Sequence, residues 1–201
     1  MNNPNIDFYH KNAQQQAALY DDQSFEDVHA HWADLIDSLP THARICDIGA
    51  GSGRDAAELI ARGFSVYAVE PAKAMREIGM QRAPQAVWLD DQLPELNQLL
   101  LANAHPYDLV LISGVWMHLT EEEQMHALHV MAEVVSEDGH LVISLRQGNF
   151  VDGRTTSHPT LSLLKSQADE AGFKVVRHQD TKDSLGHTDV SWCTVVLQLR
   201  A

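Results

Sequence analysis

The sequence predicts an α/β fold, a parallel sheet with helices on both faces. From Ala43 onward, short apolar runs alternate with runs of helical periodicity, an order typical of such folds. The last two apolar runs are joined by a polar segment instead of a helix, which predicts an antiparallel hairpin at the end of the sheet. The first 40 residues carry helical patterns alone. We therefore expect an N-terminal helical cap over residues 1–40 and one α/β domain over residues 41–201.

The N-terminal cap is expected to hold two helices, over residues 8–20 and 25–39. Apolar side chains of the second segment recur at helical spacing on one face. Ser24 can cap its N-terminus, and Pro40 ends the unit. Because these helices precede the sheet, we expect them to fold over its edge as a lid.

The expected strands and helices of the α/β domain have recognisable boundary signals. Gly63 can cap the end of the first helix and Pro71 opens the second. Thr120, with Glu123 three residues later, forms a capping box for the fourth helix. The expected strands cover residues 43–48, 64–70, 85–90, 107–113 and 140–146, followed by the hairpin strands 173–180 and 192–199. The expected helices cover residues 51–63, 72–82, 94–102, 121–136 and 160–171.

The surface charge argues against several classes of partner. The chain has 28 acidic and 14 basic residues and a formal net charge of −14, and such a surface repels nucleic acids and anionic lipids. No apolar run approaches the roughly 20 residues that cross a bilayer, so no membrane partner is expected and the cytoplasm is the expected compartment. Cys46 and Cys193 lie in apolar runs and are expected to be buried, reduced thiols. The oligomeric state stays open between a monomer and a homodimer.

A glycine-containing loop from Asp47 to Gly53 joins the first expected strand to the first helix and reads Asp-Ile-Gly-Ala-Gly-Ser-Gly. Ligands of open α/β sheets bind beyond the carboxyl ends of the strands. Glycines let the backbone approach a ligand closely, and a helix N-terminus presents free N–H groups. We therefore expect this loop to bind a ligand.

The spacing of the glycines and the acid before them select among ligands. A dinucleotide loop follows Gly-x-Gly-x-x-Gly, whereas Gly49, Gly51 and Gly53 alternate here. No phosphate-binding Gly-x-x-x-x-Gly-Lys sequence is present either. The carboxylate of Asp47 would repel a pyrophosphate but suits a cationic ligand. S-adenosylmethionine (SAM) carries a sulfonium and an ammonium group, so it is the expected cofactor.

Acidic residues also follow the next two expected strands. Glu70 ends the second strand and can accept hydrogen bonds from both hydroxyls of a ribose. Asp90, followed by Asp91, ends the third strand and can accept from the exocyclic amine of adenine, with Leu89 packing near the ring. The three strand ends thus match the amino acid, the ribose and the base of SAM in turn.

This series of residues resembles the signature motifs of the class I SAM-dependent methyltransferases. The loop from Asp47 to Gly53 resembles their first motif, Asp-x-Gly-x-Gly-x-Gly, and Glu70 and Asp90 resemble the acids of the second and third. Residues 107–113 and 138–144 resemble the motifs of the fourth and fifth strands. The closing hairpin resembles the antiparallel last strand of the family.

The resemblance runs from Ala43 to the end of the chain and implies a fold, an activity and a set of site residues. It implies a Rossmann-like, doubly wound seven-stranded sheet of order 3-2-1-4-5-7-6 whose last strand is antiparallel. It also implies methyl transfer from SAM to a small-molecule acceptor, with S-adenosylhomocysteine as product. The N-terminal helices resemble the variable caps of small-molecule members, which place tyrosines over the methionine end of SAM. The implied cofactor-binding positions are Tyr9, Tyr20, Asp47, Gly49, Ala50, Gly51, Ser52, Gly53, Arg54, Glu70, Pro71, Leu89, Asp90, Asp91, Ser113, Gly114 and Val115.

The loop after the fourth expected strand lies beside the transferred methyl group in this family, and here it reads Ser-Gly-Val-Trp-Met-His from Ser113 to His118. It lacks the Pro-Pro-Tyr type motif of the methyltransferases that modify amino groups of nucleic-acid bases or glutamine. His118 is the candidate general base, or orients the acceptor; the alternative is a structural histidine bonded to the loop backbone. Trp116 is an expected contact of the acceptor.

Basic side chains are scarce, so those near the expected acceptor pocket are candidates for binding it. Arg146 and Arg154 bound the glycine-containing loop after the fifth strand, and His158 lies close by. Arginine forks bind carboxylates well, which favours an anionic acceptor; arginines paired with nearby acids at the surface are the alternative. Arg54 can bind the methionine carboxylate of SAM or pair with Asp55 or Glu58.

Other classes of function remain as alternatives. A SAM-binding sensor or partner subunit without transferase activity would carry the same cofactor motifs, so only turnover of an acceptor separates it from an enzyme. An NAD(P)-linked oxidoreductase conflicts with the glycine spacing, with Asp47 and with the antiparallel end of the sheet. No metal site is expected, because His126 and His129 lie on the polar side of their helix and no His-Glu-x-x-His sequence is present.

Overall fold

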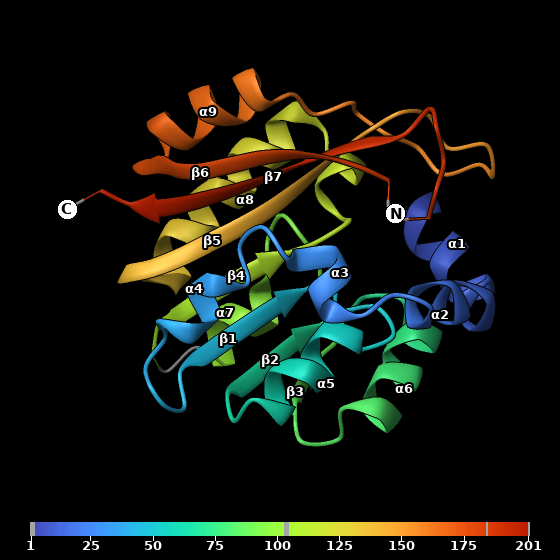
Figure 1. Cartoon of the computed structure of the whole chain (residues 1–201), viewed down its shortest axis with the longest axis horizontal. Coiled ribbons are helices and arrows are strands. Elements are labelled where there is room, and N and C mark those ends of the chain that lie inside the picture. The colour runs from blue at the N-terminus through green and yellow to red at the C-terminus, as the bar shows by residue number, and fades with distance from the viewer. Residues whose placement is uncertain (1–2, 103–104, 184, 201) are drawn as a thin grey trace.

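The computed structural model describes residues 3–102, 105–183 and 185–200, and its described part contains one seven-stranded sheet (Figure 1). The strand order is β3-β2-β1-β4-β5-β7-β6. The first five strands are parallel, and β7 is antiparallel to both β5 and β6. The predicted order and the antiparallel end are confirmed. The strands are β1 (Arg44–Ile48), β2 (Ser65–Val69), β3 (Val87–Leu89), β4 (Tyr107–Ile112), β5 (Val135–Gln147), β6 (Phe173–Lys182) and β7 (Ser191–Leu199).

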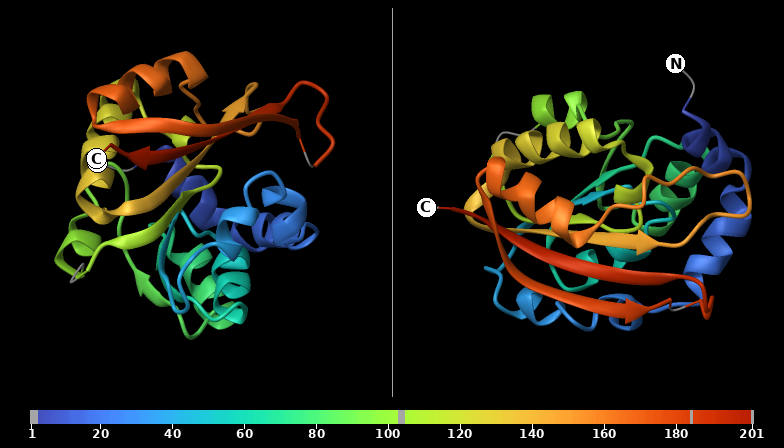
Figure 2. Two further views of the ribbon diagram at one scale, coloured as in Figure 1. Left: turned by 60° about the vertical axis from the view of Figure 1, so that its left-hand side comes forward. Right: turned by 90° about the horizontal axis from the view of Figure 1, so that it is seen from above.

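Helices cover both faces of the sheet, as predicted, and Figure 2 shows the two layers on opposite sides of the strands. The helices are α1 (Pro4–Lys11), α2 (Ala13–Asp21), α3 (Phe25–His29), α4 (Asp34–Asp37), α5 (Arg54–Ala61), α6 (Lys73–Arg82), α7 (Asn97–Ala102), α8 (Glu121–Val134) and α9 (Leu161–Glu170). Side chains of a strand alternate between faces: Val110 and Ile112 of β4 face α7, α8 and α9, whereas Leu109 and Leu111 face α3, α4 and α5.

The first two helices lie beside the carboxyl ends of the strands and pack on α6. There Ala13, Ala72 and Met75 form a small core separate from the two main ones. The predicted helix over residues 8–20 is two helices, with Asn12 between them. The first begins earlier than predicted, at Pro4, because the side chain of Asn3 accepts hydrogen bonds from two backbone N–H groups of its first turn.

The predicted single helix over residues 25–39 is wrong in its middle. It is divided into α3 and α4, and Trp32 N–H donates to the carbonyl of His29 at 3.0 Å. This tighter turn brings side chains three positions apart into line. As a result, His29 and the fully buried Trp32 both lie against α5 and the inner strands.

Several further boundaries differ from the prediction; α5, for example, begins at Arg54 instead of Gly51. Helix α7 begins at Asn97 instead of Pro94. Strand β5 begins at Val135, directly after α8, because Val135 pairs with Tyr107 before the ladder shifts register. Cys46 and Cys193 are buried and neither is in a disulfide. Over the described ranges, no helix has the length and apolar character that a bilayer crossing requires.

Candidate active site

A cavity of about 520 Å³ opens at the carboxyl ends of the central strands. Its wall is formed by the glycine-containing loop after β1, the ends of β2 and β4, the inner face of β5, and the helices α1 to α3. The N-terminal helices thus form one side of the cavity and the sheet forms the other. This is the position at which open α/β sheets bind their ligands.

The glycine-containing loop is held tightly between β2 and the loop after β4. The backbone N–H groups of Gly49 and Ala50 both donate to the carbonyl of Val69, at 2.8 and 3.0 Å. Gly49 has φ +76°, and a Cβ built on it would lie 2.2 Å from Cγ2 of Val115. No residue with a side chain fits there unless Val115 moves. The loop therefore needs glycine at this position to run close beside Val115.

Glu70 joins the end of β2 to the glycine-containing loop. Its Oε2 accepts from the N–H of Gly51 at 2.9 Å, and its Oε1 accepts from the N–H of Ala72 at 2.7 Å. Burial raises the pKa of Glu70 to about 7, although these two backbone donors act in the opposite direction. Each carboxylate oxygen has a further lone pair. Glu70 lines the cavity and can accept hydrogen bonds from two ligand hydroxyls.

Asp47 is buried at the start of the loop, and one of its oxygens lacks a partner. The residue is 2% exposed, and Oδ2 makes no hydrogen bond with any described residue. Burial raises the pKa of Asp47 well above its usual range, the negative charge of Asp55 raises it further, and Arg54 acts in the opposite direction. An unpaired buried carboxylate is costly. This oxygen is therefore a place where a cationic donor from a ligand would be stabilised.

Arg54 forms the ion pair with Asp55 that was the alternative to a ligand contact. Its Nε and Nη2 donate to the two oxygens of Asp55 at 2.7 and 3.1 Å. The side chain also lines the cavity, and its contact with a cofactor stays a prediction. Asp55 is in turn 3.0 Å from Nε2 of the buried His29, so α3 is attached to α5 through this carboxylate. Sequence reasoning missed this pair; the only signal was a histidine within the apolar stripe of residues 25–39.

Both ring nitrogens of His118 have a hydrogen-bond partner, and these partners fix the position of the ring proton. Its Nδ1 is 3.0 Å from the carbonyl of Thr155, which can only accept, so this nitrogen carries the proton. Its Nε2 is 3.2 Å from Oη of Tyr9, whose hydroxyl therefore donates to it. Arg154 donates to the same Tyr9 oxygen at 2.9 Å. Burial is the main cause that lowers the pKa of His118 from 6.5, although the Thr155 carbonyl raises it. A neutral imidazole follows.

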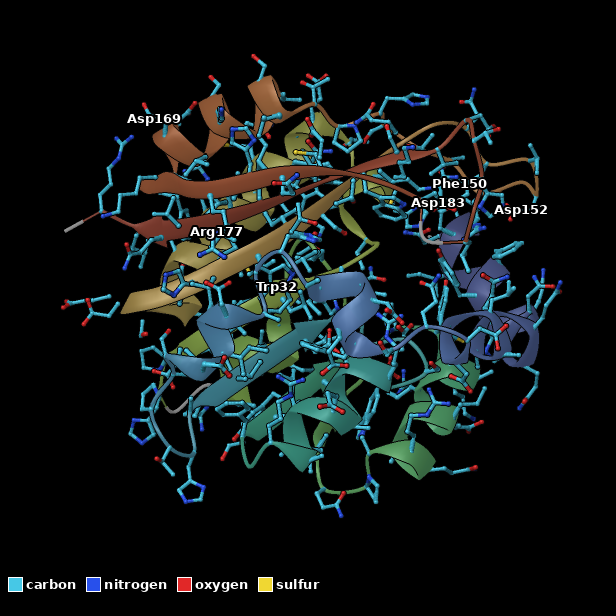
Figure 3. The ribbon with its side chains drawn as sticks, viewed as in Figure 1. Trp32, Phe150, Asp152, Asp169, Arg177 and Asp183 are labelled. Carbon is cyan, nitrogen blue, oxygen red and sulfur yellow. The ribbon has the colours of Figure 1, made fainter. Side chains whose placement is uncertain are left out.

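The first helix is attached to the loop after β5 by a pair of hydrogen bonds that the sequence did not reveal. Asn5 Nδ2 donates to Oγ1 of Thr155 at 3.0 Å, and the N–H of Thr155 donates to Oδ1 of Asn5 at 2.9 Å. The ring of Phe150, from the same loop, stacks on His118 with 5.5 Å between centroids. Figure 3 shows Phe150 and Asp152 of this loop beside the first helix. The tip of the loop and α1 close one end of the cavity together.

The two predicted arginines of the acceptor pocket differ in their partners. Arg154 forms a bidentate ion pair with Asp152, at 3.0 and 2.6 Å. Arg146 has no carboxylate within ion-pair distance among the described residues; it donates to the carbonyl of Gly148 at 2.5 Å and lies 4.0 Å from the ring centroid of Phe150. Both arginines line the cavity. Their roles toward an acceptor remain predictions.

Most of the predicted site residues meet in this one cavity. Those that line it are Tyr9, Tyr20, Asp47, Gly49, Ala50, Gly51, Ser52, Arg54, Glu70, Pro71, Asp91, Ser113, Gly114, Val115, His118, Arg146 and Arg154. Gly53 and Leu89 lie outside its lining. Asp90 pairs with Arg76 at 2.8 Å and faces a small adjoining pocket, which shares Asp91 with the cavity. The contact of Asp90 with a base stays a prediction.

Two residues expected at the acceptor lie elsewhere. Trp116 is fully buried in the core on the α8 side of the sheet, so its ring is not available to a molecule in the cavity. Burial of the large apolar ring is favourable. The sequence spacing alone did not distinguish a tryptophan of the core from one that lines a pocket. His158 is exposed and lies outside the cavity lining, with a left-handed backbone at φ 51°.

The sheet order, the glycine-containing loop and the acidic strand ends together are those of an α/β protein with a nucleotide-type binding crevice. The family described as methyltransferase domain matches residues 20–178, and the chain belongs to this family. An uncharacterized methyltransferase of Bacillus pumilus (strain SAFR-032) is 25% identical over 182 residues, which cover 79% of this chain and 83% of that relative. An uncharacterized methyltransferase of Oceanobacillus iheyensis is 28% identical over 134 residues, which cover 63% of this chain and 61% of that relative.

Solved methyltransferase structures share the fold. The 1,6-didemethyltoxoflavin-N1-methyltransferase of Burkholderia thailandensis, solved with 1,6-didemethyltoxoflavin and S-adenosylhomocysteine, superposes with a TM-score of 0.74 at 18% identity, covering 98% of this chain and 87% of that one. Magnesium protoporphyrin IX methyltransferase from Synechocystis, solved with SAM, gives a TM-score of 0.68 at 18% identity, covering 96% and 84%. At these identities the likeness concerns the fold.

Proposed function

We propose that this protein transfers a methyl group from SAM to a small-molecule acceptor and releases S-adenosylhomocysteine. The observation that carries the proposal is the buried, unpaired Oδ2 of Asp47 at the start of the glycine-containing loop. It fits the ammonium group of SAM. Glu70, with a free lone pair on each oxygen, fits the two ribose hydroxyls. Methyltransferases of the same fold have been solved with SAM or S-adenosylhomocysteine bound.

The size and charge of the site support a small acceptor. One cavity of about 520 Å³ has to hold the reacting parts of both molecules, and a net charge of −14 disfavours a nucleic acid. The Burkholderia and Synechocystis proteins are named for small-molecule acceptors. We place the acceptor beside Ser113 and Gly114, on the side of the cavity bounded by β5. The protein acts alone or as a homodimer.

Bound SAM supplies a methyl group that is already activated by its sulfonium. The protein then has to align the acceptor with that group and exclude water, and orientation of this kind contributes about 7–11 kcal/mol in favourable cases. The N-terminal helices serve this purpose: α1 closes on the loop after β5 through Asn5 and Thr155. The ring of Tyr20, near the glycine-containing loop, covers the cofactor.

His118 is the candidate general base for an acceptor that keeps its proton at neutral pH. Its imidazole is neutral, and its free-base nitrogen Nε2 faces the hydroxyl of Tyr9, which lines the cavity. A proton from the acceptor can pass to the oxygen of Tyr9 while the Tyr9 proton moves to Nε2. The carbonyl of Thr155 holds the other nitrogen, and so it stabilises the imidazolium that forms.

Isothermal titration with SAM and S-adenosylhomocysteine, with NADH as control ligand, tests the cofactor. We expect micromolar binding of both, and binding weakened at least tenfold in Asp47→Asn and Glu70→Gln. The control variant Asp169→Asn removes a carboxylate on α9, at the other end of the molecule (Figure 3), and should bind as the wild type does. Absence of SAM binding, or tight NADH binding, would refute the proposal. Binding without turnover of any acceptor would favour a sensor instead.

A further inference from the structure

We propose that the acceptor carries a carboxylate and that Arg146 binds it, an inference that rests on the proposed function. Arg146 is 9% exposed and lines the cavity. Three features of Arg146 support the proposal: its place on the acceptor side of the cavity, its lack of a counter-ion among the described residues, and the fixed orientation of its guanidinium.

The sheet register places Arg146 on the acceptor side of the cavity. Side chains two apart on a strand share a face, so Val142, Ser144 and Arg146 of β5 point the same way, and all three line the cavity. The Ser144 hydroxyl accepts from the N–H of Gly114, in the loop after β4, at 2.7 Å. Arg146 is two residues further along β5, about 7 Å beyond this contact. A molecule that reaches from the loop after β4 along β5 meets the guanidinium.

Unlike the other two arginines that line the cavity, Arg146 has no carboxylate partner among the described residues. Arg54 is paired with Asp55, and Arg154 with Asp152, in each case through two hydrogen bonds. Among the described residues, the guanidinium of Arg146 makes a single hydrogen bond, to the backbone carbonyl of Gly148. A buried charge is normally paired. An anionic ligand bound in the cavity would therefore be the counter-ion of Arg146.

The nearby carboxylates of Asp183 and Asp189 act on Arg146 from a distance, and neither forms an ion pair with it. Asp183 is negative and close enough to act on Arg146, but its oxygens accept from Nε1 of Trp192 at 2.8 Å and Nδ1 of His187 at 2.6 Å. Figure 3 shows Asp183 and Phe150 at the same end of the molecule. Lys182, which also lines the cavity and has no ion pair with a residue that the structure describes, is exposed on the hairpin. The positive charge of Arg146 is therefore the one placed for a buried anion.

The orientation of the guanidinium is fixed before an acceptor arrives. The ring centroid of Phe150 lies 4.0 Å from the guanidinium carbon of Arg146 and 4.1 Å from the guanidinium carbon of Arg154. The Gly148 carbonyl holds one nitrogen, which leaves the remaining N–H groups of the fork for a ligand. A preorganised fork of this kind suits the planar, bidentate carboxylate group.

The carboxylate acts as an anchor, and the methyl group is received by another atom of the acceptor. Lone pairs that accept hydrogen bonds from a guanidinium are poor nucleophiles. The partly exposed apolar side chains of Val115 and Phe150 line the same cavity. The acceptor class is therefore a small carboxylic acid with an apolar or aromatic body.

Ligand-detected NMR on the protein saturated with S-adenosylhomocysteine tests the anchor directly. The probes are butyrate, benzoate and 4-hydroxybenzoate, each compared with its primary amide. We expect at least one acid to bind ten times more tightly than its amide. Arg146→Gln should abolish that difference, Arg146→Lys should restore part of it, and Arg200→Gln, a matched change at the far end of the chain, should leave it intact. Failure of every acid to bind, or equal binding by Arg146→Gln, overturns the inference.

The titration of the cofactor separates this inference from the proposed function. Normal affinity of Arg146→Gln for S-adenosylhomocysteine, with loss of acid binding, supports both. A fall in cofactor affinity of tenfold or more in Arg146→Gln would instead mean that Arg146 holds the amino-acid carboxylate of the cofactor, which overturns the anchor and leaves the function in place. In a turnover screen, methylation of neutral amides as fast as of their acids would likewise overturn it.

Discussion

Oη of Tyr9 lies 3.2 Å from Nε2 of His118, so a residue of the first helix reaches the candidate base in the loop after β4. The tautomer of the histidine is fixed on its other side, because the Thr155 carbonyl can only accept and so holds the proton on Nδ1. The role proposed for His118 as a general base depends on this pair, and the protonation of the histidine can be measured without knowing the acceptor.

We predict that His118 titrates below 6.5 and is the Nδ1–H tautomer at pH 7. The physical reason is that burial disfavours the imidazolium, with the charges of Arg154 and Arg146 adding to the effect. Nitrogen-detected NMR of the histidine rings measures both properties. Assignment by the His118→Asn variant identifies the signal. An Nε2–H tautomer, or a pKa above 6.5, would contradict the arrangement.

The lowered pKa of His118 also predicts how turnover depends on pH. Because the pKa of His118 is lowered, Nε2 carries no proton at neutral pH. Turnover should therefore be constant at neutral pH and fall as the pH drops through the lowered pKa of His118. His118→Asn should lower kcat by about 10²–10⁴ and remove this acidic limb, while its affinity for S-adenosylhomocysteine stays within twofold. An unchanged acidic limb in the variant would show that another group titrates.

We predict that the cofactor displaces a proton from Glu70. The carboxyl has a pKa of about 7 because of burial, and ribose hydroxyls bind the ionised form better. Titration calorimetry at pH 7 in buffers of different ionisation enthalpy should therefore detect release of roughly half a proton per S-adenosylhomocysteine bound. Glu70→Gln should release roughly half a proton fewer than the wild type, and any release that remains is assigned to Asp47, whose pKa burial also raises.

The same raised pKa has a consequence for stability. A group whose pKa is raised in the fold stabilises it below the unfolded pKa, here 4.5, and that contribution is lost as the pH rises through about 7. Between these values the free energy of unfolding of the cofactor-free wild type should fall more steeply with pH than that of Glu70→Gln. Urea unfolding at several pH values measures this difference, and equal slopes would argue that Glu70 is ionised throughout.

We predict that Asp55→Asn destabilises the protein by about 3–5 kcal/mol at pH 7, as when one partner of a buried ion pair is removed. Asp55 is 6% exposed and holds both His29 and Arg54. Its partners lower its pKa despite burial, so its contribution is present above the unfolded pKa of 3.8 and is lost as the pH falls through the lowered value. The penalty should therefore shrink in acid.

Urea unfolding of Asp55→Asn at pH 7 and below pH 4 checks this prediction. The matched control is Asp34→Asn, which removes the exposed pair with Arg177 between α4 and β6. It should change stability little, because exposed pairs contribute little. Equal effects of the two variants would mean that the pair of His29 and Asp55 does not hold α3 on α5.

We predict that Gly49→Ala weakens cofactor binding at least tenfold. The new Cβ would lie 2.2 Å from Cγ2 of Val115, on a backbone at φ +76°. Titration with S-adenosylhomocysteine measures the loss. In the double variant Gly49→Ala/Val115→Ala the clashing methyl is gone, so part of the affinity should return.

Gly63→Ala provides the control for backbone strain alone. Its φ of +92° is also left-handed, but nothing lies within 4 Å of the added Cβ. This variant should lose some stability and keep full affinity. If Gly49→Ala and Gly63→Ala behaved alike, strain and not the contact with Val115 would explain the loss.

Sequence reasoning reached the parts of the site that depend on position along a strand. Asp47 and Glu70 are at the ends of predicted strands, and adjacent parallel strands bring such ends together whatever the helices do. Whether a side chain points into the cavity or into the core was harder to predict. Trp116 was expected in the pocket and is in the core, because one apolar residue in a loop fits either environment.

Contacts between distant segments were beyond the sequence. The bonds of Asn5 to Thr155 and of His29 to Asp55 join polar residues with no periodicity or motif to reveal them. The break between α3 and α4 also depends on contacts with distant segments. The burial of Trp32 against them overrides the helical pattern of residues 25–39. Arg146 was identified because basic residues are scarce in the sequence, but only the structure reveals that no described carboxylate pairs with it.

The attachment of α1 to the loop after β5 also decides how the protein can be handled. Asn3, at the start of this helix, lines the cavity, whereas β7 ends at the opposite end of the molecule from α1 (Figure 1). A purification tag or fluorescent fusion joined ahead of α1 would start beside the cavity and compete with ligands. One joined after β7 would extend away from it, and is the suitable design for immobilising the protein or screening acceptors.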